Sequence, residues 1–384
     1  MGPFPHDAPP ATISAQNPMG TDGFAFVEFA HPEPAQLHAL FRLMGFTAVA
    51  KHRTKAITVY RQGDVDYLVN EEPGAHASRF AALHGPCASS MGFRVVDATH
   101  AYDRARRLGV GPADPAAGAL ALDVPALKGI GGSLLYLIDR YGDKGSVYDD
   151  AFDWLGARDP KPEGRGLYYI DHLTHNVGRG RMNVWTCFYE RLFDFRQIRY
   201  FDIKGEYTGL FSRALTSPDG KIRIPINESA DERSQIEEYL HRYKGEGIQH
   251  VACGCRDIYA TIERLRTDGL GFMPAPPATY YERVDERVPG HGEDLARLMR
   301  NGILIDGEGA VAVGEKQGSM TKVLLQIFSA NLIGPIFFEF IQRKGDEGFG
   351  EGNFRALFVS IEEDQIRRGV LKAPDARSAA CCGA

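Results

Sequence analysis

The sequence has no apolar run of the roughly 18–20 residues that a membrane-spanning helix needs. Residues 1–20 also lack the basic-then-apolar pattern of a secretory signal. We therefore expect a cytoplasmic protein that begins with a flexible tail. Cysteine is scarce, with six in 384 residues, which argues against a disulfide framework. Positive charge is not in excess either: the formal net charge is −6, so the chain has no general electrostatic attraction for nucleic acid.

Two common ligand signatures are also missing. Gly348–Phe354 is rich in glycine, but it lacks the G-x-G-x-x-G spacing and a Walker lysine, so it is not a nucleotide loop. Cys253 and Cys255 form a C-x-C pair without a partner pair at zinc-binding spacing. In a strand these two cysteines share one face, and we expect them to pack in the core.

The chain contains a weak internal repeat. Asp97–Val110 aligns without gaps with Asp257–Leu270, at an offset of 160 residues. Asp, Arg and Gly recur at matching places, so we expect each aspartate to cap the start of a helix and each glycine to follow its end. Two further pairs of segments match, Ser133–Arg140 with Ile336–Arg343 and Phe41–Phe46 with Glu190–Phe195.

The repeated order of strand, helix and several strands predicts the fold class. It indicates an α+β protein whose helices pack on one side of curved, largely antiparallel sheets. We expect an N-terminal domain over residues 21–150 and a C-terminal domain over 167–370, with a linker at 151–166. Residues 1–20 and 371–384 are expected to be flexible tails.

A duplicated chain provides an internal control on function. Residues that match between the halves serve the fold, whereas residues present in one half only are candidates for chemistry. His250 aligns with Ser90, and Glu339 aligns with Tyr136. We therefore expect any metal site to lie in the second half.

His250 and Glu339 are two candidate metal ligands, and a third ligand has two candidates. His172 and His175 lie three residues apart in a predicted strand, so they point to opposite faces and only one can face the site. Glu339 lies in an apolar strand sequence, and burying its carboxylate without a partner would cost several kcal/mol. This favours a metal or another cation beside it over a surface position. Two histidines and one carboxylate with open coordination positions are typical of a non-haem Fe(II) oxygenase.

Six motifs occur in order along the second half of the chain. They are IDHLTHN at 170–176, IPINE at 224–228, GIQH at 247–250, LQIF at 325–328, FFEFIQR at 337–343 and GFGEGNF at 348–354. Together they resemble the 4-hydroxyphenylpyruvate dioxygenase family, and the resemblance extends over residues 20–370. It implies a vicinal-oxygen-chelate, glyoxalase-like fold. In that fold each half is an open β-barrel of paired βαβββ modules, and a C-terminal helix gates the second barrel.

The resemblance also implies roles for individual residues. The implied metal ligands are His172, His250 and Glu339. The implied polar groups that orient the substrate are Ser212, Asn227, Gln235, Gln249 and Gln326. The implied substrate-binding residues are Pro225, Phe328, Phe337, Phe349, Asn353, Phe354 and Leu357, with Phe328 and Phe354 on the two sides of the aromatic ring. Amides, a hydroxyl and aromatic faces suit a phenolic keto acid.

The reaction implied by the resemblance is a step of tyrosine catabolism. 4-Hydroxyphenylpyruvate and O₂ are converted to homogentisate and CO₂ by oxidative decarboxylation, ring hydroxylation and side-chain migration. One Fe(II) per subunit is the implied cofactor, and O₂ is the co-substrate. Because the substrate carries its own 2-oxo acid, no 2-oxoglutarate is expected. The expected partners are this small aromatic acid and further copies of the chain in a homodimer or homotetramer, without nucleic acid or membrane.

Three alternatives stay open. Hydroxymandelate synthase uses the same substrate and iron but oxidises the benzylic carbon; Pro225, Asn227 and Phe354 are the residue types of the dioxygenase. An extradiol ring-cleaving dioxygenase is disfavoured by the three glutamines and the phenylalanine pair. A non-catalytic binding protein of the same fold would tolerate loss of the ligands, whereas all three are present.

Phe354→Ile tests the implied ring contact. Hydroxymandelate synthase tends to have a smaller aliphatic residue at this position, so the substitution should divert product from homogentisate towards hydroxymandelate. Chromatography and mass spectrometry of the products measure the ratio. A pure homogentisate yield would show that residue 354 does not decide the outcome.

Overall fold

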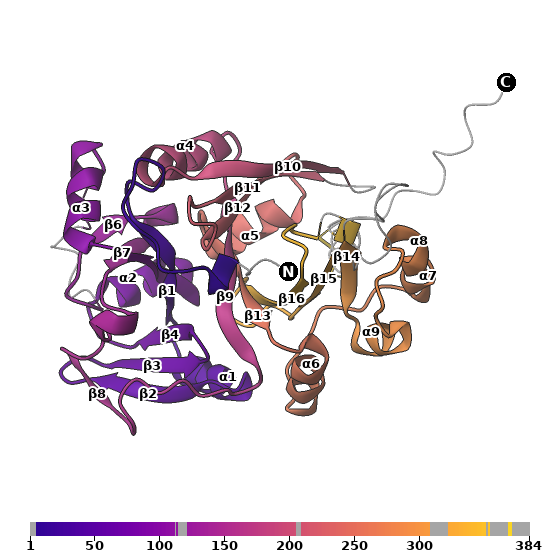
Figure 1. The fold of residues 1–384 in the computed structure, drawn as a ribbon, viewed down its shortest axis with the longest axis horizontal. Helices are drawn as coiled ribbons and strands as arrows, with labels where there is room; N and C mark the ends of the chain where they lie inside the picture. Colours follow the sequence, from indigo (N-terminus) through magenta and orange to yellow (C-terminus); the bar gives the residue numbers. More distant parts are fainter. Residues whose placement is uncertain are drawn as a thin grey trace.

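Two curved sheets form the body of the protein, one from each half of the chain (Figure 1). The computed structural model describes residues 5–111, 113, 121–204, 209–307, 322–350, 352–353 and 368–370. Each sheet has eight strands, in the order β6-β7-β5-β1-β4-β3-β2-β8 for the first and β10-β11-β12-β9-β13-β16-β15-β14 for the second. The predicted α+β fold with two related halves is confirmed.

The elements follow the chain in two similar series. The first half contains β1 (Thr21–Ala30), α1 (Ala35–Leu43), β2 (Thr47–His52), β3 (Ile57–Gln62), β4 (Val65–Asn70), α2 (His76–His84), β5 (Cys87–Val95), α3 (Ala98–Arg107), β6 (Ala126–Lys128), β7 (Leu134–Ile138) and β8 (Phe152–Trp154). The second half contains β9 (Leu167–Val177), α4 (Met182–Phe193), β10 (Arg196–Lys204), β11 (Gly209–Thr216), β12 (Arg223–Ser229), α5 (Gln235–Tyr243), β13 (Gly247–Cys255), α6 (Ile258–Thr267), α7 (Ala278–Glu282), α8 (Val284–Arg287), α9 (Leu295–Asn301), β14 (Leu304–Gly307), β15 (Val323–Phe328) and β16 (Phe337–Lys344). Short 3₁₀ turns occur at Pro5–Asp7, Ile130–Gly132 and Gly142–Lys144.

The predicted helix caps are confirmed in both halves. The side chain of Asp97 accepts a hydrogen bond from the backbone N–H of His100 at the start of α3. Asp257 accepts the equivalent bond from Ala260 at the start of α6. Gly109 and Gly269 follow the two helices with φ of +83° and +96°, a conformation that costs glycine little.

The two sheets share one apolar core. Phe29, Tyr67 and Phe338 meet between the halves, with ring centroids 5.2 Å apart for Phe29–Tyr67 and 5.9 Å apart for Tyr67–Phe338. Cys253 packs beside them, and its Sγ lies 3.0 Å from the hydroxyl of Tyr67. Cys253 and Cys255 are both buried and free of disulfides, as the packing interpretation predicts. Because side chains alternate along a strand, the opposite face of each sheet is left to line a barrel.

Strand register shows which residues of the halves are equivalent. His250 pairs with Phe337, and Ser90 pairs with Leu134, so Glu339 and Tyr136 occupy equivalent places. His172 pairs with Ala252, as Phe26 pairs with Gly92, so the counterpart of His172 is Phe26.

The first barrel is filled at the position that the three candidate ligands occupy in the second. The rings of Phe26 and Tyr136 lie 5.5 Å apart in a buried apolar cluster. The carboxyl group of Glu28 lies next to them and accepts hydrogen bonds from Ser90 at 2.5 Å and Asn70 at 2.6 Å. This half therefore has a packed interior where the other half has candidate ligands.

The structure shows contacts at two of the predicted boundaries. Met19 is fully buried and Asn17 hydrogen-bonds Thr21, so the end of the predicted tail 1–20 is part of the folded body. The predicted linker 151–166 begins with β8, which pairs with β2 and completes the first sheet. The predicted gating helix with Phe354 and Leu357, and the predicted tail 371–384, lie outside the described residues. No helix among the described residues is long and apolar enough to cross a membrane.

Gly131→Ala tests the contact between the halves. Gly131 has φ of +59°, and an added Cβ would lie 1.9 Å from the backbone oxygen of Glu246. The left-handed conformation costs alanine about 1–2 kcal/mol, and the overpacking adds about 1–3 kcal/mol. Urea unfolding measures the loss. Gly109→Ala is the matched control, because Gly109 has φ of +83° and, among the described residues, no atom lies within 4 Å of an added Cβ. Equal losses in the two variants would contradict a close contact at Gly131.

Candidate metal centre

The candidate ligands lie on three adjacent strands. β9 carries His172, β13 carries His250 and β16 carries Glu339, in the middle of the second sheet. Ala252 pairs with His172 on one side and with Glu339 on the other. Because His250 lies two residues before Ala252, its side chain points to the same face. Strand register therefore brings together three residues that are up to 167 positions apart in the sequence.

The donor atoms form a compact triangle. His172 Nε2 lies 3.0 Å from Glu339 Oε2 and 3.3 Å from His250 Nε2, and His250 Nε2 lies 3.4 Å from Glu339 Oε2. Donors held about 2.1 Å from one cation at right angles to each other are about 3.0 Å apart. The three side chains thus fit one face of a metal coordination sphere and leave the opposite face open.

The charges of the three residues are coupled. Burial acts to raise the pKa of the Glu339 carboxyl, but the imidazoles of His172 and His250 outweigh burial and lower that pKa to about 2. Burial also lowers the pKa of His250. For His172, burial acts to lower the pKa, but the carboxylates of Glu339 and Asp171 outweigh it and raise the pKa. A divalent cation bound by all three side chains would compete with protons for the same donor atoms.

The choice between the two histidines of β9 is decided by the direction of their side chains. His175 is fully buried on the other side of the strand, where its Nε2 lies 2.7 Å from the hydroxyl of Tyr189 in α4. His175 therefore packs between sheet and helix, and His172 is the histidine that faces the barrel.

Polar neighbours hold both imidazoles. The Nδ1 of His250 lies 3.1 Å from Gln249 Oε1, and the Nδ1 of His172 lies 2.9 Å from Asp171 Oδ1. When Nδ1–H donates to such an oxygen, the lone pair remains on Nε2, which is the nitrogen inside the triangle. Thr174 Oγ1 also lies 2.9 Å from His250 Nε2.

A small cavity of about 50 Å³ lies beside the triangle. It is lined by the three ligands and by most of the other predicted site residues, namely Ser212, Pro225, Asn227, Gln235, Gln249, Phe328, Phe337 and Phe349. Phe337 stacks on the His250 ring with centroids 4.7 Å apart, and Phe349 meets the His172 ring edge-on at 5.6 Å. We call this the inner cavity.

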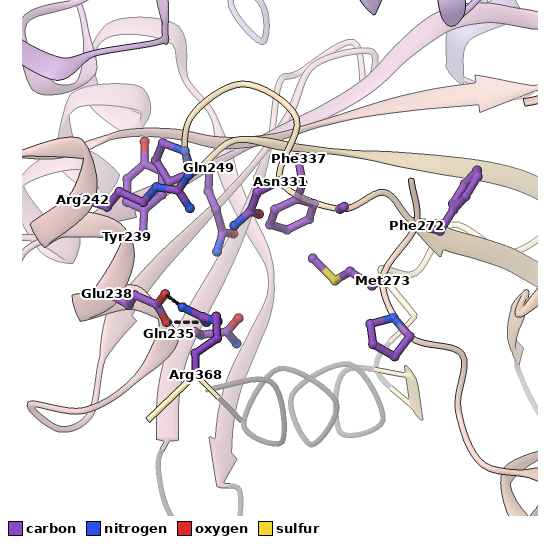
Figure 2. A pocket seen from close by; sticks show the side chains of 13 residues that line it. Gln235, Glu238, Tyr239, Arg242, Gln249, Phe272, Met273, Asn331, Phe337 and Arg368 are labelled. Carbon is purple, nitrogen blue, oxygen red and sulfur yellow. Dashed lines mark hydrogen bonds and ion pairs between the residues drawn. The ribbon is translucent and has the colours of Figure 1, made fainter. Parts of the chain in front are cut away.

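A larger cavity of about 300 Å³ adjoins the inner cavity, and we call it the outer cavity (Figure 2). Gln235, Gln249 and Phe337 line both cavities, so they form the wall between them. Figure 2 shows Arg242 of α5 on one side of the outer cavity and Met273 on the other.

Some predicted site residues do not line the inner cavity. Gln326 is buried on β15, and neither polar atom of its amide has a hydrogen-bond partner among the described residues. An added Cβ on Gly350 would lie 2.5 Å from this amide, so the 346–350 loop packs directly against it. Asn353 is fully buried and accepts a hydrogen bond from the hydroxyl of Tyr280 at 2.5 Å. Phe354 and Leu357 lie outside the described residues.

Three residues at the site were missed by the sequence analysis. Thr174 and Leu210 line the inner cavity, and Asp171 contacts His172. Thr174 lies two residues after His172, and Leu210 lies two residues before Ser212. The period of two along a strand could have found both.

Fold and site together define the class of protein. Two barrels of βαβββ modules, one of them holding a three-donor site, are the architecture of the vicinal-oxygen-chelate proteins. In agreement, residues 169–287 match the family described as "Glyoxalase/Bleomycin resistance protein/Dioxygenase superfamily". Residues 15–153 match the family described as "Hydroxyphenylpyruvate dioxygenase, HPPD, N-terminal".

Comparison with named relatives identifies one family within this class of proteins. The chain is 56% identical to the 4-hydroxyphenylpyruvate dioxygenase of Pseudomonas sp. strain P.J. 874, over 93% of this chain and 98% of that protein. It is 55% identical to the enzyme of the same name from Pseudomonas aeruginosa, over 94% of this chain and 99% of that protein. The chain belongs to the 4-hydroxyphenylpyruvate dioxygenase family.

Solved structures agree with the fold. A xylose isomerase-like TIM barrel/4-hydroxyphenylpyruvate dioxygenase fusion protein matches with a TM-score of 0.75 and 29% identity, over 92% of this chain and 53% of that longer one. A mutant of 4-hydroxymandelate synthase from Streptomyces coelicolor matches with a TM-score of 0.73 and 23% identity, over 90% of this chain and 99% of that one. The second likeness shows the fold alone.

Glu339→Gln tests the three-donor site. The change keeps the size of the side chain but removes the charged ligand, so affinity for a divalent metal should fall by at least about 100-fold. Calorimetric titration of the metal-free protein with Co(II) measures the affinity. Glu28→Gln is the matched control, because Glu28 is equally buried but lies in the first barrel. Equal affinity in the two variants would remove Glu339 from the ligand set.

Proposed function

We propose that this chain is a 4-hydroxyphenylpyruvate dioxygenase that converts 4-hydroxyphenylpyruvate and O₂ to homogentisate and CO₂. The carrying observation is the buried triangle of His172, His250 and Glu339, with 3.0–3.4 Å between donor atoms, in a chain that belongs to this family. Two imidazoles and one carboxylate suit Fe(II) and leave positions for two ligands. Bound at this site, Fe(II) supplies the centre at which the 2-oxo acid chelates and O₂ is activated.

The protein contributes orientation and exclusion of water. We assign Gln249 to positioning His250, because its Oε1 already lies 3.1 Å from the imidazole Nδ1. We assign Gln326 to the substrate, because a buried amide without a partner among the described residues is available for a ligand. An unsatisfied buried polar group costs about 1–3 kcal/mol, and a ligand hydroxyl or carboxylate relieves that cost.

The remaining wall residues suit a phenolic ring. Ser212 and Asn227 face each other on β11 and β12 and supply hydrogen-bonding groups for the phenol or the keto acid. Phe328 and Phe337, with ring centroids 6.0 Å apart, supply aromatic faces. Phe349 closes the cavity against His172.

The volume of the inner cavity indicates how the aromatic ring of the substrate enters the site. A cavity that holds benzene measures roughly 150 Å³, whereas the inner cavity measures about 50 Å³. We infer that substrate binding displaces part of the wall formed by Gln235, Gln249 and Phe337. The inner and outer cavities then join into one space that accepts the ring.

Three further expectations stay predictions. They are the cytoplasmic location, assembly into a homodimer or homotetramer, and the division into domains at residues 21–150 and 167–370. The roles given to Pro225, Asn353, Phe354 and Leu357 in substrate binding are likewise proposals that follow from the family.

Reconstitution tests the proposed function. Metal-free protein is loaded anaerobically with Fe(II) and mixed with 4-hydroxyphenylpyruvate and O₂, and products are identified by mass and chromatography. Homogentisate and CO₂ in equal amounts are expected, and none from Glu339→Gln treated in the same way. Hydroxymandelate would keep the metal site but contradict the assigned reaction. Bound iron without product would favour the non-catalytic binding protein.

A further inference from the structure

Asp171, the residue before the ligand His172, lies in a buried charged network behind the metal site. Its carboxylate is fully buried and lies 2.9 Å from His172 Nδ1. Arg343 donates two hydrogen bonds to it, from Nε at 2.7 Å and from Nη2 at 2.8 Å. Tyr169 donates a third at 2.8 Å, and Arg223 Nη1 approaches at 3.3 Å. The carboxylate is therefore held rigidly against the imidazole.

The same guanidinium also holds the loop on the other side of His172. Arg343 Nη1 donates to the backbone oxygens of Gly348 at 2.5 Å and Asp346 at 3.2 Å. The next residue, Phe349, packs its ring on the imidazole of His172 with centroids 5.6 Å apart. Arg343 thus contacts both the Asp171 carboxylate behind His172 and the 346–350 loop, whose Phe349 ring packs against His172.

The first half of the chain shows that the fold does not need this network. Ala25, next to Phe26, stands where Asp171 stands next to His172, and Arg140 stands at the repeat position of Arg343. Arg140 is about one-third exposed and pairs with the half-buried Asp149 at 3.8 Å and with the exposed Asp150. At the position of Asp171 the first half has Ala25, so among the described residues this carboxylate–arginine contact belongs to the barrel with the three donors.

The burial of the network limits what the Asp171–Arg343 ion pair contributes to the stability of the fold. Arg343 is 2% exposed, and a buried ion pair contributes little net stability compared with apolar residues of the same volume. Groups that hydrogen-bond the second nitrogen of a ligating histidine commonly change metal affinity by 10–100-fold.

We propose that Asp171 and Arg343 form a positioning pair that sets the orientation of the metal ligand His172 and anchors the loop that places Phe349 over it. The proposal rests on the proposed function, because it assigns the pair to the metal site described above.

The test measures metal affinity separately from folding. Co(II) is titrated into the metal-free wild type, Asp171→Asn, Arg343→Met and the double variant, and thermal unfolding of each metal-free protein is recorded. Arg343→Met alone removes the two shortest charged hydrogen bonds of the buried Asp171 carboxylate and should be the least stable. The double variant removes both charges and should regain much of that stability, since no buried carboxylate is left without its main partner.

The expected result is a 10–100-fold loss of Co(II) affinity in Asp171→Asn and in the double variant, although both remain folded. Glu263→Gln is the control, because it breaks the partly exposed Glu263–Arg297 pair between α6 and α9, and neither residue lines the inner cavity. Its Co(II) affinity should equal that of the wild type. If the double variant binds Co(II) as tightly as the wild type, the pair is only structural and the proposal is wrong. A wild type that binds no Co(II) would overturn the proposed metal site and this proposal together.

Discussion

The structure depends on one electrostatic constraint, the burial of a carboxylate between two imidazoles. Glu339 is 3% exposed, and its charge is tolerable there only because His172 and His250 lie within 3.4 Å of its oxygen. That arrangement requires β9, β13 and β16 to be adjacent and in one register, because a shift by a single residue would turn a ligand to the opposite face. The packing of Phe338 and Phe340 into the shared core fixes the register of β16.

Duplication explains how such a site can exist within a stable protein. Both halves use the same strand order around their central strands, but the first fills its barrel with Phe26 and Tyr136. The interior of the first barrel therefore stabilises the fold by packing. The second barrel has candidate ligands and a cavity in the same place. The interface of Phe29, Tyr67 and Phe338 joins the halves. The packed interior of the first half thus supports the half that holds the candidate ligands and the inner cavity.

Function requires more than the three donors. A ring of the expected substrate needs more room than the inner cavity of about 50 Å³ offers, and the outer cavity of about 300 Å³ lies beyond a wall of three side chains. Two of these are glutamines and the third is Phe337, all of which can change rotamer without moving the backbone. Behind the site, the Asp171–Arg343 pair is held by several hydrogen bonds at once. The arrangement combines a rigid metal side with an adaptable substrate side.

The sequence by itself determined the fold class, the duplication, the helix caps at Asp97 and Asp257, and the half of the chain that holds the candidate site. Those features depend on local patterns and on comparison of one half with the other. Tertiary structure alone decided that His172 faces the barrel and His175 faces Tyr189, that Met19 belongs to the core, and that residues 152–154 complete the first sheet. It also brought Arg343 to Asp171, across 172 residues of sequence. Contacts of this kind depend on strand register and on which face of a strand meets which layer, and neither is encoded within a short stretch of residues.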